Sequence, residues 1–217
     1  MPMWRSRGRS ASSAFDMTRT LSKAEAQSDL LLARYVKCFE RFDEMLSYGG
    51  MNSAADELAL PTANELGQIG WRPRRVEPNP ELLDVLYRRI PTRFPRLFER
   101  LLLTFRWAEV SLDTYSLMEN PVGPNLDGFY TAISKDRGLW DPLASAGFIR
   151  FGKGPDMNYD PICFDMNSRR KSGEMKVVRI DHEEVLCNMR IKIVSELAPN
   201  FESLVRGTIA AAGEKQS

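Results

Sequence analysis

The chain has 217 residues, of which 43% are hydrophobic and 27% charged, as in an ordinary globular protein. Its 30 lysines and arginines are balanced by 29 acidic residues, which excludes a strongly basic nucleic-acid binder and an acidic solvating protein. No apolar run approaches the roughly 20 residues that cross a bilayer, and a chain of this length can bury a core without a metal or a disulfide.

The first residues are basic and poor in apolar side chains. Arg5, Arg7 and Arg9 lie among serines and glycine, and no acidic residue appears before Asp16. Such a segment buries too little apolar surface to offset the entropy cost of ordering it. Residues 1–20 are therefore predicted to be a flexible basic arm.

The next segment favours helices. Ser22 and Glu25 have the spacing of a capping box, and the apolar residues that follow at steps of three and four predict a long helix ending at Gly49-Gly50. A short helix from Ser53 to Leu60 and a turn over 65–69 are expected next, followed by an extended linker over 71–75. We predict a helical extension over 21–78, with the 22–48 helix as a candidate contact for an oligomer.

A change of period marks the start of a sheet. Asn79-Pro80 is typical of a helix start, Ile90-Pro91 interrupts the helix, and a second one beginning at Thr92 or Arg93 carries apolar residues to Phe105. After Phe105 the apolar period falls from 3.6 to 2, which predicts one or two short strands with a turn near 113–114.

The remainder alternates between loops, short helices and strands. A short helix ending near Gly138 and a helical turn over 139–143 are followed by predicted strands over 148–151, 162–164, 175–181 and 191–197. Pro199 is expected to begin a terminal helix. We predict an α+β domain over 79–212, with a mixed or antiparallel sheet packed against helices, and a tail over 213–217.

The three cysteines do not suggest a site. Cys38, Cys163 and Cys187 are widely spaced and form no C-x-x-C pair, which argues against a zinc knuckle and a disulfide framework. A reducing compartment fits this usage best. We expect a cytoplasmic protein without a cofactor.

The densest group of acids with a histidine is Asp181-His182-Glu183-Glu184. On a strand, Asp181 and Glu183 would share one face, where two carboxylates can bind a hard cation while His182 acts as an acid or base. The H-E-x-x-H spacing of zinc proteases is absent. A metal-dependent hydrolase using Asp181, His182 and Glu183 is thus an alternative function, beside the simpler interpretation of a polar strand end.

Aromatic side chains beside charged ones suggest a partner-binding surface, because Trp, Tyr and Arg dominate binding hot spots. The candidates are Trp107, Glu109, Tyr115, Lys153, Asp156 and Tyr159. A second alternative is weak nucleic-acid binding through arginines, namely Arg5, Arg7, Arg9, Arg72, Arg74 and Arg75.

Several short motifs over roughly 80–212 occur in an order that resembles the SUKH superfamily, which groups yeast cell-wall-assembly regulators with bacterial toxin-immunity proteins. The motifs are Ile90-Pro91-x-x-Phe94 before Leu101-Leu102-Leu103, Pro161-Ile162-Cys163-Phe164-Asp165, Val177-Val178-Arg179-Ile180-Asp181-His182-Glu183, and Leu197-Ala198-Pro199-Asn200-Phe201-Glu202-Ser203-Leu204. Where the family often has an Asn-Gly-Gly turn, this chain has Thr104-Phe105-Arg106-Trp107.

The resemblance implies a non-enzymatic protein-binding module of α+β fold, such as an immunity protein that neutralises a toxin in the cytosol. It implies no catalytic residue. It also implies that the partner is a protein. The composition and the lack of a long apolar run favour neither a membrane nor a nucleic acid as partner.

Overall fold

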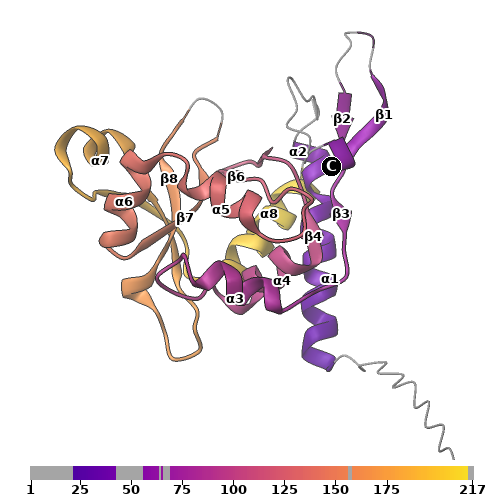
Figure 1. Ribbon diagram of the computed structural model, residues 1–217, viewed down its shortest axis with the longest axis horizontal. Coiled ribbons are helices and arrows are strands. Elements are labelled where there is room, and N and C mark those ends of the chain that lie inside the picture. The colour runs from indigo at the N-terminus through magenta and orange to yellow at the C-terminus, as the bar shows by residue number, and fades with distance from the viewer. Residues whose placement is uncertain (1–21, 43–55, 64, 66–68, 156–157, 215–217) are drawn as a thin grey trace, which may run out of the picture.

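The computed structural model describes residues 22–42, 56–63, 65, 69–155 and 158–214 (Figure 1). The predicted basic arm, the Gly49-Gly50 helix end and the candidate residue Asp156 lie outside these ranges.

The predicted capping box begins the first helix, α1 (Lys23–Lys37), as expected. The Ser22 hydroxyl accepts a hydrogen bond from the Glu25 backbone N–H at 3.3 Å, and the Glu25 carboxylate accepts one from the Ser22 N–H at 2.9 Å. A turn at Cys38 separates α1 from the short helix α2 (Phe39–Phe42), so the predicted single helix is interrupted there.

The described residues from Asp56 onward do not form the helix predicted to run to Leu60, and the predicted turn over 65–69 lies largely outside the described ranges. A 3-10 turn, η1 (Asp56–Leu58), leads into β1 (Ala59–Ala63), which pairs antiparallel with β2 (Ile69–Trp71). Strand β3 (Arg74–Arg75) pairs with β4 (Phe105–Arg106). Pro61 explains the difference, because it has no N–H for a helix interior but is tolerated in a strand at the edge of a sheet.

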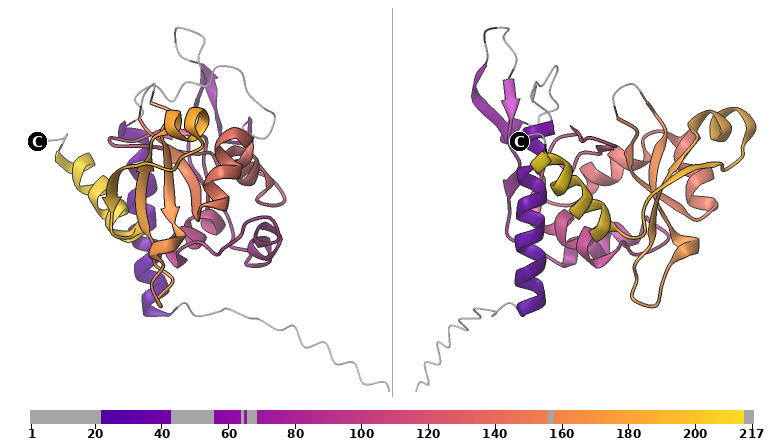
Figure 2. Two further views of the ribbon diagram at one scale, coloured as in Figure 1. Left: turned by 90° about the vertical axis from the view of Figure 1, so that its left-hand side faces the viewer. Right: turned by 180° about the vertical axis from the view of Figure 1, so that it is seen from behind.

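The described N-terminal residues contribute to the main core, which the predicted helical extension did not anticipate. Leu32, Tyr35, Phe39, Leu58 and Trp71 are all buried in the same cluster as the apolar residues of the later chain. Helix α1 packs along α8 (Phe201–Glu214), as Figure 2 also shows. The apolar stripe that suggested an oligomer contact is thus largely covered within the chain.

Helices precede the sheet and interrupt it. The Asn79 side chain accepts a hydrogen bond from the Glu81 N–H just before α3 (Glu81–Tyr87), but the N-cap of this helix is Pro80 and not Asn79 as predicted. Helix α4 (Arg96–Thr104) begins only after Pro95, later than expected, since the residue before a proline is disfavoured in the helical region. Helix α5 (Asp127–Ser134) is followed by α6 (Arg137–Ser145), which is longer than the predicted turn.

A six-stranded antiparallel sheet confirms the predicted α+β class. Its strands are β5 (Val110–Ser111), β6 (Ser116–Leu117), β7 (Phe148–Lys153), β8 (Pro161–Asp165), β9 (Lys176–Ile180) and β10 (Ile193–Ala198). They lie in the order β10-β9-β8-β7-β6-β5, and each pairs antiparallel with its neighbours. Neighbours in the sheet are therefore neighbours in chain order, with α5 and α6 inserted between β6 and β7.

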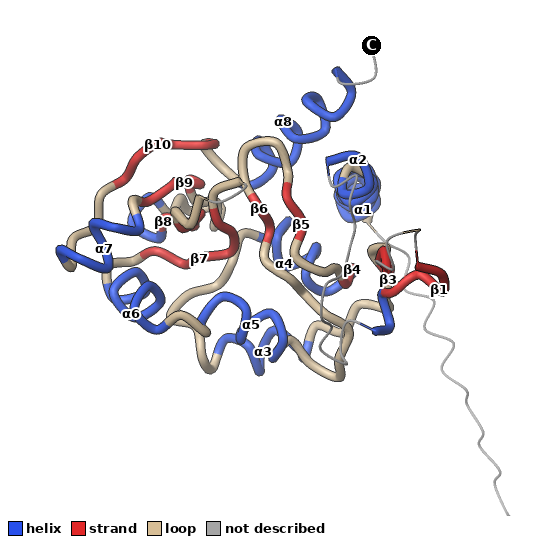
Figure 3. Tube along the Cα trace, turned by 90° about the horizontal axis from the view of Figure 1, so that it is seen from above, coloured by secondary structure: helices blue, strands red, loops and turns tan. Residues whose placement is uncertain are grey.

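The two faces of this sheet are covered differently. Because side chains alternate along a strand, Phe164 and Val177 face α4, α5 and α8 in the larger core cluster, whereas Cys163 and Val178 face α6 and α7 (His182–Asn188) in a smaller one. Figures 1 and 3 show α6 and α7 on one side of the strands and α4 and α8 on the other. Within the described ranges, every helix is too short or too polar to span a lipid bilayer.

Candidate functional site

Asp181 begins a helix, which corrects the prediction that residues 181–184 continue a strand. Its carboxylate accepts a hydrogen bond from the Glu184 N–H at 3.1 Å and thereby caps α7, and its other oxygen lies 3.1 Å from Lys192 Nζ. The bond from the Glu184 N–H and the Lys192 ammonium both lower the pKa of Asp181. The D-x-x-E spacing in the sequence is the signal for this cap.

Helix α7 ends in an unusual backbone conformation. Met189, its C-cap, has φ 51° and ψ 34°, and it is the one non-glycine residue with positive φ in the described chain. A long side chain in the left-handed region costs of order 1 kcal/mol, and this position is normally filled by glycine or asparagine. Met189 is also 74% exposed. An apolar residue in this position gains no burial that offsets its backbone cost.

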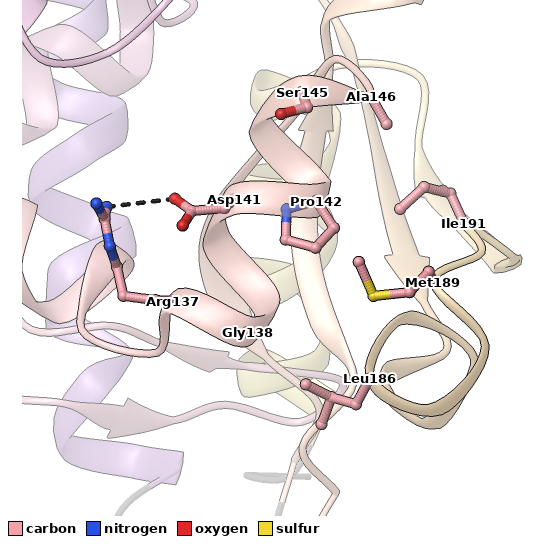
Figure 4. Close-up of a pocket in the computed structure, with 9 residues that line it drawn as sticks. All are labelled: Arg137, Gly138, Asp141, Pro142, Ser145, Ala146, Leu186, Met189 and Ile191. Atoms are coloured by element: carbon pink, nitrogen blue, oxygen red, sulfur yellow. Dashed lines mark ion pairs between the residues drawn. The ribbon is translucent and has the colours of Figure 1, made fainter.

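A shallow groove of about 690 Å³ lies between α6 and the C-terminal end of α7. Helix α6 contributes Gly138, Pro142 and Ala146 to its wall, and Leu186, Met189 and Ile191 form the opposite wall. In Figure 4 the Met189 side chain points toward Pro142, and the Arg137–Asp141 ion pair lies at one end of the groove. The walls are mainly apolar although the groove is open to solvent.

Exposed apolar residues are concentrated in the chain segment that supplies one wall of this groove and the start of β10. Seven large hydrophobic side chains are exposed in the described chain, and four of them fall within residues 186–194. These are Leu186, Met189, Ile193 and Val194. We call Leu186, Met189, Ile191, Ile193 and Val194 the apolar ridge. Clusters of this kind mark interaction surfaces more often than isolated exposed residues do.

The ridge continues onto an edge of the sheet. Ile193 and Val194 begin β10, which is the last strand in the sheet order and pairs with β9 alone among the described strands. The outer side of such a strand presents backbone donors and acceptors that can pair with another chain.

Three of the predicted partner-binding residues come together at the other end of α7. Lys153 Nζ lies 2.6 Å from Glu109 Oε1 and 6.0 Å from the ring centre of Tyr159, which is half exposed. The Tyr159 ring in turn lies 6.3 Å from the ring of His182, the first residue of α7. Glu109, Lys153 and Tyr159 thus lie close together, and Tyr159 is the one next to the start of α7.

Trp107 and Tyr115 are corrected to core residues, because both are fully buried and cannot contact a partner. The Trp107 indole N–H donates to the Met118 carbonyl at 2.8 Å. The Tyr115 hydroxyl lies 2.6 Å from that of Tyr35, and burial raises the pKa of Tyr115 to about 12. Their polar atoms are satisfied inside the protein, so their aromatic character serves the core.

The predicted acid and histidine cluster does not assemble as a metal site. His182 Nδ1 lies 2.8 Å from Asp160 Oδ1, a carboxylate that also lies 3.7 Å from Arg179, whereas Asp181 is occupied by the α7 cap. In the described part of the chain, no group of three or more His, Cys, Asp or Glu side chains is placed to hold a metal ion. The histidine partner, Asp160, was not among the predicted site residues.

The arginines of the nucleic-acid alternative are partly neutralised. Arg72 lies 3.9 Å from Glu40, Arg74 lies 2.8 Å from Glu57, and Arg75 lies 3.7 Å from Asp29. Each of these three cations therefore has a carboxylate within ion-pair distance, which reduces the charge available for phosphates. Arg5, Arg7 and Arg9 lie outside the described residues.

Comparison with known proteins does not assign the chain to a family. No protein-family model matches it, and no curated protein matches it in sequence.

Proposed function

We propose that this chain is a non-enzymatic protein-binding domain of the SUKH type. Its binding surface is the apolar ridge together with the α6/α7 groove, and its occupant is an extended apolar segment of a partner protein. On the SUKH resemblance, the partner is a toxin that the chain neutralises in the cytosol. The observation that carries the proposal is the concentration of exposed apolar side chains within residues 186–194.

We propose an extended segment of the partner because β10 lies at the edge of the sheet. A strand added beside β10 would pair with its backbone, while alternate side chains would reach the ridge. The groove begins two residues before that strand, at Ile191. An apolar side chain of the same segment can therefore enter the groove while the backbone pairs with β10.

The backbone at Met189 supports the same surface. A left-handed methionine is costly for folding, and such positions are often kept where function requires them. Methionine is flexible and polarisable, which suits a surface that must adapt to a partner. Because Met189 is exposed beside the groove, a role in binding would explain why the chain keeps this costly backbone conformation.

The metal-dependent hydrolase has weaker support. Asp181 serves as a helix cap and His182 is paired with Asp160, so two of the three proposed ligands are engaged in different interactions. The Asp160–His182 pair can orient a base, but within the described residues no Ser, Cys or Thr side chain hydrogen-bonds the imidazole.

The test uses tagged full-length chain to recover binding proteins from its native host. Met189→Asp and Ile193→Asp place a charge in the ridge, and Leu30→Asp is the matched control, because Leu30 is 65% exposed on α1 far from the groove in sequence. We expect one protein to bind the wild type and Leu30→Asp, and to lose at least about tenfold in affinity with the two ridge variants.

A growth assay with the recovered protein then tests whether it is a toxin. Its expression alone should arrest growth of a test strain, and co-expression of the chain, but not of Met189→Asp, should restore it. Equal binding by all three variants would contradict the assignment of the surface. If the wild type forms dimers that Ile193→Asp abolishes and no other protein binds, the occupant is a second copy of the chain and the proposal is wrong.

A further inference from the structure

A second cavity, of about 260 Å³, lies between the β8–β9 hairpin and the segment that joins α3 to α4. The hairpin forms the lower end of the sheet in Figure 1. Five cationic side chains line the cavity, together with a single acidic one. They are Arg93, Arg96, Arg169, Arg170 and Lys171, with Glu99 as the acid. We call these five cations the basic pocket.

The positive charge of the basic pocket is only partly compensated. Glu99 accepts a hydrogen bond from the Tyr87 hydroxyl at 2.7 Å, and Arg93 lies 3.7 Å from Asp84, with both side chains largely exposed. In the described chain, Arg96 and Lys171 have no carboxylate within ion-pair distance, whereas the charge of Arg170 acts on the Glu174 carboxyl, where it opposes the rise in pKa that burial causes. Like charges gathered around one cavity repel each other and attract an anion to it.

The hairpin holds its cations in a defined geometry. Arg169 hydrogen-bonds through its guanidinium to the Thr92 hydroxyl, which joins the hairpin to the α3–α4 segment. Within the turn, the Gly173 N–H donates to the Arg170 carbonyl and the Arg170 N–H donates to the Glu174 carbonyl, both at 2.9 Å. Gly173 has φ 88°, which a residue with a side chain rarely adopts. The three consecutive cations are therefore on an ordered turn.

The helix beside the pocket adds to its preference for anions. Arg96 is the first residue of α4, a nine-residue helix with no side-chain cap at its N-terminus. The positive end of the helix dipole favours negative charge within the first turn. This contribution is secondary to that of the five side chains.

We propose that the basic pocket binds a compact polyanion, namely a diphosphate or triphosphate group. Four of its five cations are arginines, whose planar guanidinium groups match pairs of phosphate oxygens. The volume lies below the ~300 Å³ of pockets for drug-sized ligands, so the enclosed part of the ligand is the phosphate group itself. The proposal does not rest on the protein-binding function, because the pocket and the apolar ridge share no residue.

The test measures binding of inorganic pyrophosphate and triphosphate to the full-length chain by calorimetry at about 50 mM salt, where electrostatic attraction is weakly screened. Arg96→Gln and Arg170→Gln remove one cation each. Arg170→Lys keeps the charge but removes the planar guanidinium that can bond two phosphate oxygens. Arg206→Gln is the matched control, since Arg206 is an exposed arginine that pairs with Glu202 on α8. All three side chains are exposed, so the four variants should fold.

We expect each glutamine variant to weaken binding by at least about tenfold, Arg170→Lys to weaken it less, and Arg206→Gln to leave it unchanged. No binding at millimolar ligand, or equal losses in all variants including Arg206→Gln, would overturn the proposal. A nucleoside triphosphate that binds more tightly than inorganic triphosphate would identify a nucleotide as the source of the phosphates. Binding of a single-stranded oligonucleotide without binding of either inorganic anion would also overturn it.

Discussion

Helices bury the two faces of the sheet to different extents. On the face toward α4 and α8, Phe98 packs against Phe151 and Phe164 from the strands and Phe201 from α8, with ring centres 5.0 to 5.3 Å away. On the other face, α6 and the seven-residue helix α7 cover a smaller cluster and leave the groove beside Met189. The first face holds the fold together, and the second leaves apolar surface exposed to solvent.

One face of the sheet therefore contributes mainly to stability, and the other offers the surface proposed to bind a partner. Aromatic rings that are fully buried contribute their whole surface to folding and have none left for a partner. The short helix α7 buries Val185 alone of its seven residues, and Leu186 next to it is exposed. The proposed binding surface therefore lies on the more thinly covered face.

The largest expected effect is on the aromatic face. Phe98→Ala removes a fully buried ring from contact with five other aromatic rings, and we expect a loss of about 3–5 kcal/mol in the free energy of unfolding. Leu143→Ala is the comparison on the other face, where Leu143 is also fully buried but in the smaller cluster. Denaturant unfolding at equilibrium measures both.

If the faces differ as described, Phe98→Ala should lower the free energy of unfolding more than Leu143→Ala does. An equal or larger loss for Leu143→Ala would show that the α6/α7 face contributes as much as the aromatic one. Neither face would then be the weaker one, and the exposed groove would not mark a less stable part of the sheet.

The sequence predicted the aromatic face better than the groove, for physical reasons. The apolar residues of α4 and α8 repeat at helical spacing, and those of β7 to β9 form short apolar runs, so their elements could be assigned from the pattern alone. Helix α7 follows β9 directly, and the strand-forming residues before Asp181 made the cap resemble a strand end. Seven residues are too few for helical periodicity to appear.

Burial of individual aromatic residues was the least predictable feature. Trp107 and Tyr115 lie beside charged residues in the sequence, as hot-spot residues do, yet both are core residues. Their burial depends on α1 and α8, since Tyr115 meets Tyr35 and Thr208 across 80 and 93 residues of sequence. No local pattern contains that information. The basic pocket was missed for the same reason, although the Arg169-Arg170-Lys171 run was visible.

A smaller change in the free energy of unfolding, of opposite sign, is expected for a substitution at Met189. Met189→Gly relieves the left-handed backbone without removing a buried side chain, and we expect it to raise the free energy of unfolding by up to about 1 kcal/mol. The same change removes part of the apolar ridge, so affinity for the partner protein should fall. Thermal unfolding and binding measured on the same preparation check the two effects together.

Gly147→Ala is the matched control for this substitution, because Gly147 has φ 88° and lies close to Asn167. It should lower stability, since a side chain there is strained and crowded. If Met189→Gly also lowers stability, the left-handed conformation costs nothing. If it stabilises the chain and leaves binding unchanged, Met189 is not part of the binding surface.

The smallest expected effect is the pH dependence of the α7 cap. The pKa of Asp181 is lowered in the folded chain by the bond from the Glu184 N–H and by Lys192. A lowered pKa gives stability that is present above the unfolded value and is lost as the pH falls through the folded one. Asp181→Asn keeps a capping side chain but does not titrate, so its disadvantage relative to wild type should be present near pH 7 and disappear as the pH falls through the lowered pKa of Asp181. Amide hydrogen exchange in α7, compared with that in α4, measures this locally. If the difference in exchange between the two proteins stays constant with pH, Asp181 acts through its shape and not through its charge. If the difference is equally large in α4, the substitution lowers the stability of the whole chain and not that of α7 in particular.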